Sequence, residues 1–93
     1  MSRKKLLTGL QLSAIRGLLR VSQEEFGKKA GVSGGKIKNA ERFKFRESGS
    51  VASMKKIMGY LEKQGIEPYE DDESIGIAIS KKELKKTEKK SRK

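Results

Sequence analysis

The chain lacks several residue types on which common protein chemistry depends. It contains no Cys, which excludes disulfide bonds, a thiol nucleophile and thiolate metal sites. It contains no His, the side chain that serves most often as a general base and as a zinc ligand. It also has no Gly-rich segment with the spacing of a phosphate-binding loop. We therefore expect neither an enzyme nor a bound cofactor or metal.

Long apolar runs are also missing. No stretch approaches the roughly 18 apolar residues that a membrane-spanning helix needs, and the N-terminus lacks the apolar core of a signal peptide. We therefore expect a cytoplasmic protein without a membrane partner. With 93 residues, the chain has room for one small domain and a tail.

Charge divides the chain into three segments. Residues 1–65 carry fifteen Lys and Arg against five Glu, and residues 66–80 carry five acids and no cation. Residues 81–93 carry eight Lys and Arg against two Glu and have a single apolar residue. We predict a basic domain that begins with a basic arm, an acidic extension and a disordered basic tail. The net charge of +11 favours an anionic partner.

Residues 1–65 are dominated by helix signals. Thr8 with Gln11, and Ser22 with Glu25, have the spacing of capping boxes. Gly31 can supply a left-handed helix stop. Apolar residues then recur at helical spacing after each cap. We predict helices over Gly9–Arg20, Gln23–Ala30 and Gly34–Glu41, and a fourth from the cap Ser50 to a stop at Gly65, with Val51, Met54, Ile57, Met58 and Leu61 facing inward.

The apolar period changes to two after the fourth helix. Ile75, Ile77 and Ile79 alternate with small residues, which predicts a half-buried strand. Residues 66–69 are its predicted partner across an acidic turn, with Pro68 confining that strand to the sheet edge. The isoleucine stripe either covers the fourth helix or forms an edge for a partner chain.

The spacing of the second and third helices is typical of a helix-turn-helix. In such a unit two short helices are joined by a few residues that include Gly, and the second helix enters the DNA major groove. The segments Leu19–Phe26 and Ala30–Ser33, followed by Ile37 and Glu41, resemble the phage Cro/repressor-type (XRE) family over residues 7–61. The resemblance implies a mainly α, compact four-helix, lambda-repressor-like domain, here followed by a short β-hairpin.

The resemblance also implies a site. It assigns a phosphate contact to Gln23 and a structural ion pair to Arg16 and Glu41. The third helix and the loop after it then supply the contacts to bases and phosphates. The implied DNA-binding set is Gln23, Ser33, Gly34, Gly35, Lys36, Lys38, Asn39, Arg42, Lys44 and Arg46.

The third helix departs from the family pattern at its first two positions. Gly34 and Gly35 have no side chain that could read a base edge. Three explanations remain open: base contacts by Lys36 and Asn39, a close approach of the glycine backbone to the groove, or recognition of DNA shape.

Two further segments each allow two interpretations. In Arg42–Arg46, cations alternate with Phe43 and Phe45, which favours phosphate contacts over base stacking on single strands. The acids of residues 70–73 lack the spacing of a calcium loop, so an acidic turn is favoured over a cation site.

Together these features predict a dimeric regulator of transcription, acting as a repressor on double-stranded DNA. The alternative is an antitoxin that binds a toxin protein through the hairpin or tail. A third hypothesis is an RNA- or ribosome-associated adaptor, suggested by the Lys-rich tail.

Overall fold

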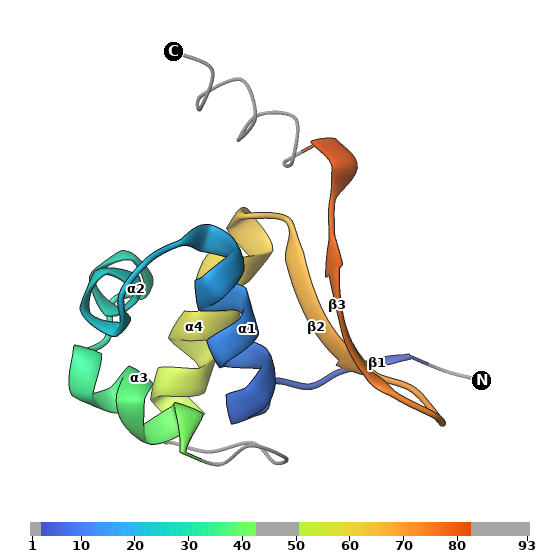
Figure 1. The fold of residues 1–93 in the computed structure, drawn as a ribbon, viewed down its shortest axis with the longest axis horizontal. Coiled ribbons are helices and arrows are strands. Elements are labelled where there is room, and N and C mark those ends of the chain that lie inside the picture. The colour runs from blue at the N-terminus through green and yellow to red at the C-terminus, as the bar shows by residue number, and fades with distance from the viewer. Residues whose placement is uncertain (1–2, 43–50, 83–93) are drawn as a thin grey trace.

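A computed structural model describes residues 3–42 and 51–82 (Figure 1). These residues form four helices and a three-stranded antiparallel sheet. The helices lie together on one side of the molecule, and the sheet covers their other side. The elements in chain order are β1 (Lys4–Lys5), α1 (Gly9–Leu19), α2 (Gln23–Ala30), α3 (Gly34–Glu41), α4 (Val51–Lys63), β2 (Ile66–Glu70) and β3 (Ile75–Ile79).

The predicted caps start the first three helices. Both hydrogen bonds of the capping box are formed by Thr8 with Gln11 and by Ser22 with Glu25. The Ser33 side chain accepts a hydrogen bond from the Lys36 N–H at the start of α3. α2 and α3 therefore have their predicted limits, whereas α1 ends one residue early because Arg20 takes a left-handed conformation with φ of 57°. The predicted cap Ser50 lies outside the described residues.

The core lies between the helices and the inner face of the sheet. Phe26 is fully buried and meets the Tyr60 ring edge-on, with 5.4 Å between ring centroids. Val51, predicted to face inward, is instead 85% exposed, because α4 turns its buried face to the core only from its third residue onward. The buried apolar side chains are Leu7, Leu12, Ile15, Phe26, Ala30, Ile37, Ala40, Ile57, Leu61 and Ile66.

The sheet contains one strand that the sequence did not predict. β1 pairs with β2 on the side away from β3, so β2 is the central strand rather than an edge. Pro68 fits there because its carbonyl, which accepts from the Leu6 N–H at 3.2 Å, faces the β1 side. The proline nitrogen faces the same side and cannot return a hydrogen bond to Leu6, so the β1–β2 ladder ends just beyond its last residue pair, Lys5 with Tyr69.

Gln11 joins the helices to the sheet. Its side chain is buried, and its Nε2 donates to the carbonyl oxygens of Tyr69 at 3.1 Å and Gly76 at 2.8 Å. These two residues face each other across β2 and β3. One amide therefore closes the capping box of α1 and also holds both hairpin strands, which fixes the sheet relative to α1.

Candidate nucleic-acid interface

A tight turn joins α2 to α3. Gly31, with φ of 85°, ends α2, and the N–H groups of Gly31 and Val32 both donate to the Gly27 carbonyl. A Cβ on Gly27 would lie 2.5 Å from the Val32 carbonyl oxygen, so this position excludes any side chain. Sequence reasoning missed this constraint, although a glycine inside a short amphipathic helix was a signal for it.

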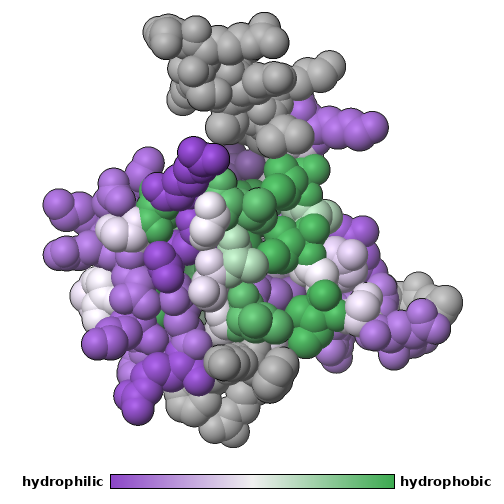
Figure 2. Space-filling view, in the orientation of Figure 1, coloured by the Kyte–Doolittle hydropathy of each residue, from purple (hydrophilic) through white to green (hydrophobic). Residues whose placement is uncertain are grey.

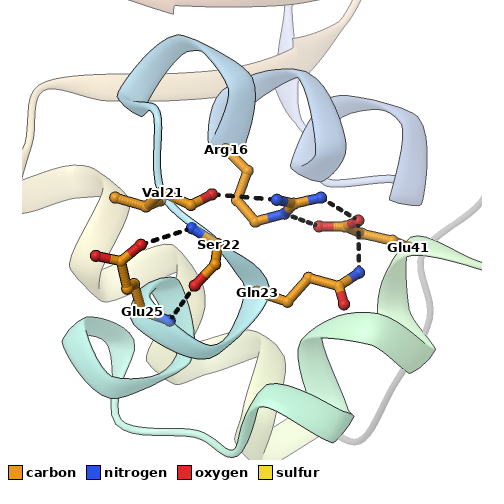
Figure 3. A network of polar contacts seen from close by, with 6 residues as sticks. All are labelled: Arg16, Val21, Ser22, Gln23, Glu25 and Glu41. Carbon is orange, nitrogen blue, oxygen red and sulfur yellow. Dashed lines mark hydrogen bonds and ion pairs between the residues drawn. The ribbon is translucent and has the colours of Figure 1, made fainter.

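A polar network fixes α3 against α1 and α2 (Figure 3). The Arg16 guanidinium binds both carboxylate oxygens of Glu41, with Nε–Oε2 at 2.6 Å and Nη2–Oε1 at 3.0 Å. Its Nη1 donates to the Val21 carbonyl at 3.1 Å. The hydrogen bond with Glu41 raises the pKa of Arg16 above its ordinary value. The two residues predicted to pair are therefore in bidentate contact across 25 positions of sequence.

Gln23 belongs to the same network. Its Nε2 donates to Glu41 Oε1 at 3.1 Å, and its side chain is half-buried at the start of α2. Figure 3 shows the amide reaching from α2 toward the Glu41 carboxylate. One hydrogen of the amide nitrogen is used in this bond, and the second is left for an acceptor outside the network.

The outer side of α3 is polar and exposed. Gly35, Asn39 and Arg42 follow one another at intervals of four and three residues, so they share one face. Arg42 Nη1 lies 3.4 Å from Asn39 Oδ1, which places the guanidinium beside the amide. Lys36 and Lys38 are exposed on the flanks of this face, and Ser33 stands at its N-terminal end.

The two glycines of α3 have different surroundings. A Cβ on Gly34 would lie 3.1 Å from the Glu24 Cα, so α3 approaches the backbone of α2 closely at this point. A Cβ on Gly35 would meet only the Ser33 hydroxyl oxygen, at 3.9 Å. Gly34 is thus required by helix packing, whereas Gly35 leaves an open position at the N-terminal end of the exposed face.

Acidic side chains bind cations elsewhere in the molecule. Within residues 3–42 and 51–82, the ion pairs are Arg3–Glu67, Lys4–Glu70, Lys5–Glu62 and Arg16–Glu41. The predicted basic arm is therefore folded onto the acidic β2 and the end of α4. None of these pairs involves Lys36, Lys38 or Arg42, and α3 and the sheet lie at opposite sides of the molecule (Figure 1).

The acidic segment between β2 and β3 forms a turn closed by Asp71. The Asp71 carboxylate accepts hydrogen bonds from the N–H groups of Glu73 and Ser74 and from the Ser74 hydroxyl. These bonds hold the pKa of Asp71 below its ordinary value. In the described part of the chain, no three acidic residues are grouped so that they could hold a metal ion.

Several predicted features lie beyond the described residues. Lys44 and Arg46, together with Phe43 and Phe45, fall within residues 43–50, and most of the predicted tail falls within residues 83–93. Among the helices that are described, none is long and apolar enough to cross a membrane.

Comparison with known proteins adds no assignment. No protein-family model matches the chain, and no curated protein matches it either.

Proposed function

We propose that this protein is a regulator of transcription that binds double-stranded DNA through a lambda-repressor-like helix-turn-helix formed by α2 and α3. In this proposal α3 lies in the major groove, α2 crosses the phosphate backbone, and binding represses transcription. The spacing of the two helices and the positive charge raised the expectation of a DNA ligand, and the resemblance to the XRE family raised those of a lambda-repressor-like fold and a regulatory role.

One observation carries the proposal. The exposed side of α3 presents three cations and an amide, and no described carboxylate forms an ion pair with those cations. Glu41, the acid within α3, is turned inward and neutralised by Arg16. A helix surface whose cations form no ion pair with a described carboxylate, on a chain with a net charge of +11, is suited to an anionic ligand.

The roles of individual residues follow from their positions. Asn39, at the middle of the exposed face, is assigned to a base edge, where its amide can pair with adenine. Lys36 lies one turn nearer the N-terminus of α3 and is assigned to guanine. Because Gly35 has no side chain, the DNA can approach the helix backbone closely at this position. Lys38, Arg42 and Ser33 are assigned to phosphates, as are Lys44 and Arg46 in the segment of sequence that follows.

Gln23 is assigned a double role. Its bond to Glu41 orients the amide, and the remaining hydrogen of Nε2 is directed to a phosphate near the start of α2. A contact of this kind would link the phosphate backbone to the network that positions α3.

Selection of duplexes from a random DNA library tests the proposal. We expect enrichment of a defined sequence at near-physiological salt. Asn39→Ala should lower the preference for that sequence by about 1–3 kcal/mol, because a bidentate base contact is lost. Lys38→Ala should weaken binding to all duplexes alike and reduce the salt slope by about one.

Lys63→Ala is the matched control. Lys63 is an exposed lysine at the end of α4 away from α3, and its removal changes the net charge as Lys38→Ala does. Equal losses from Lys38→Ala and Lys63→Ala would show that binding follows net charge alone and would contradict the assignment to α3. Equal affinity for structured RNA and duplex DNA would contradict the choice of ligand.

A further inference from the structure

A groove lies between α4 and the sheet. Its volume of about 1050 Å³ is close to the upper limit of about 1,000 Å³ for small-molecule sites. The apolar part of its lining comes from Val51, Met54 and Met58 on α4 and from Ile66 and Pro68 on β2. Methionine side chains are flexible, so such a lining can adapt to an apolar ligand. None of the described lining residues belongs to α3.

Gly59 leaves one wall of the groove without a side chain. It lies within α4, where glycine destabilises a helix relative to alanine. A Cβ at this position would meet no atom within 4 Å, and Gly59 has no positive φ. Neither packing against the described residues nor backbone conformation therefore requires a glycine here. A side chain would narrow the groove, so the glycine is explained if a ligand uses this space.

Lys55 gives the groove a cation without a described acidic partner. Of the four charged residues described in the lining, three are in ion pairs: Lys5 with Glu62 at 4.0 Å, and Glu67 with Arg3 at 2.6 Å. Within residues 3–42 and 51–82, Lys55 forms no such pair. One unpaired cation beside an apolar strip matches a ligand that has one anionic group and an apolar body.

We propose that this groove binds a small apolar carboxylate, such as a medium-chain alkanoate. The carboxylate pairs with the Lys55 ammonium group, and the apolar chain lies along Met54 and Met58 in the space that Gly59 leaves open. Lys55 and Gly59 are four residues apart on one side of α4, so both can contact the same ligand. Burial of the chain supplies the affinity, and the cation supplies the preference for an anion.

A second apolar area provides an internal comparison. Figure 2 shows it on the face of the molecule that carries α1 and β3, where Leu10, Leu18, Ile75 and Ile79 are exposed. β3 contains no charged residue. An apolar molecule can adsorb to this area, but a preference for a carboxylate is expected only in the groove. The proposal does not depend on DNA binding, so it is tested without DNA and can fail independently of the proposed function.

Titration of the full chain with sodium octanoate, followed by ¹H–¹⁵N NMR, gives the first test. We expect saturable shifts of the amides of Lys55, Met58 and Gly59, and smaller shifts for Leu10 and Leu18. The uncharged 1-octanol has a chain of the same length and should bind the groove about threefold more weakly. Larger saturable shifts at Leu10 and Leu18 than in the groove, or equal affinities for the two probes, would overturn the proposal.

Filling the groove gives the second test. Gly59→Leu should weaken octanoate binding about tenfold, because the new side chain occupies the space of the apolar chain. Gly17→Leu is the matched control, since Gly17 is an exposed helical glycine on α1 whose Cβ would also meet no atom within 4 Å. This control should bind octanoate as the wild type does. Equal losses in the two variants would contradict the proposed site, and thermal unfolding shows whether both remain folded.

Removal of one charge gives the third test. Lys55→Gln should weaken octanoate binding about threefold to fivefold and leave octanol binding unchanged, because one exposed ion pair is lost. Lys63→Gln makes the same change in net charge at an exposed lysine of α4 that does not line the groove, and it should leave both affinities unchanged. Equal losses from the two variants would show that the overall charge attracts octanoate and would overturn the placement of the carboxylate at Lys55.

Discussion

At the residue scale, the glycines around the turn between α2 and α3 are required for different reasons: close backbone contact at some positions and a positive φ at another. Gly27 lies against the Val32 carbonyl, Gly31 has a positive φ, and Gly34 lies against the backbone of α2. Gly35 satisfies none of these constraints. The sequence places the four glycines within nine residues, but only the packing shows that three are structural. This leaves Gly35 as the one whose openness is available to a ligand.

Alanine substitution separates Gly34 from Gly35. Gly35→Ala should raise the free energy of unfolding by about 0.5–1 kcal/mol, because alanine favours the helix and its Cβ meets open space. Gly34→Ala should give no such gain, since its Cβ must push α3 away from Glu24. Chemical denaturation of both variants measures the difference. A gain of similar size from both would show that α3 has room to shift away from α2.

The DNA affinity of these variants extends the comparison. If the groove approaches the backbone at Gly35, then Gly35→Ala should weaken duplex binding even though it stabilises the fold. Unchanged affinity in the stabilised variant would remove Gly35 from the proposed contact surface and leave Lys36 and Asn39 as the base-reading residues.

At the element scale, α3 is positioned by bonds that come from two other helices. Arg16 of α1 and Gln23 of α2 both bind the carboxylate of Glu41, and Arg16 also holds the Val21 carbonyl between those helices. The network is half-buried, so water screens it less than the exposed pairs of the arm. The angle at which α3 presents its outer face therefore depends on one carboxylate.

Removal of that carboxylate should be costly. Glu41→Ala leaves Arg16 with a single carbonyl partner, and we expect the free energy of unfolding to fall by about 2–4 kcal/mol. Urea denaturation measures this loss. The control is Glu62→Ala, which removes an exposed acid 4.0 Å from Lys5 and should change stability by about 0.5 kcal/mol or less.

A paired substitution distinguishes lost attraction from lost volume. Arg16→Met combined with Glu41→Leu removes both charges and keeps apolar bulk, so it should restore much of the stability that Glu41→Ala loses. Equal destabilisation by the single and paired variants would show that shape, rather than an unpaired charge, accounts for the loss.

At the scale of the whole molecule, opposite charges are separated along the long direction of the fold. The acids of residues 66–80 lie on the sheet and attract the N-terminal cations, while no described carboxylate forms an ion pair with the outward-facing cations of α3 at the far side. The excess of cations remains large, however, and the folded chain must tolerate repulsion among them.

Salt should therefore strengthen the fold while it weakens DNA binding. Screening by added NaCl reduces the repulsion within a chain of charge +11. It also weakens the exposed ion pairs, but these contribute little to stability. Relief of about 1 kcal/mol would raise the melting temperature by about 4–8 °C in a domain of this size. Calorimetry at fixed protein concentration between about 50 and 500 mM NaCl provides the measurement. A falling melting temperature would show that the surface ion pairs outweigh the repulsion.

Local signals in the sequence determined the helices. Thr8, Ser22 and Ser33 each satisfy backbone N–H groups within three residues, and Gly31 ends α2 by its own conformation. These effects act between neighbours in sequence, so α2 and α3 have the limits that spacing predicted. The link between Arg16 and Glu41 was expected from family resemblance, because nothing local relates two residues so far apart.

Tertiary structure decided what depends on contacts between distant segments. Residues 4–5 have no strand signal of their own, and they become β1 because β2 offers unpaired backbone groups beside Pro68. The cations of Arg3, Lys4 and Lys5 bind acids more than 50 residues away instead of forming a free arm. Val51 follows the apolar pattern of α4 yet lies in solvent, because periodicity gives the direction of a face but not how far the core extends along it.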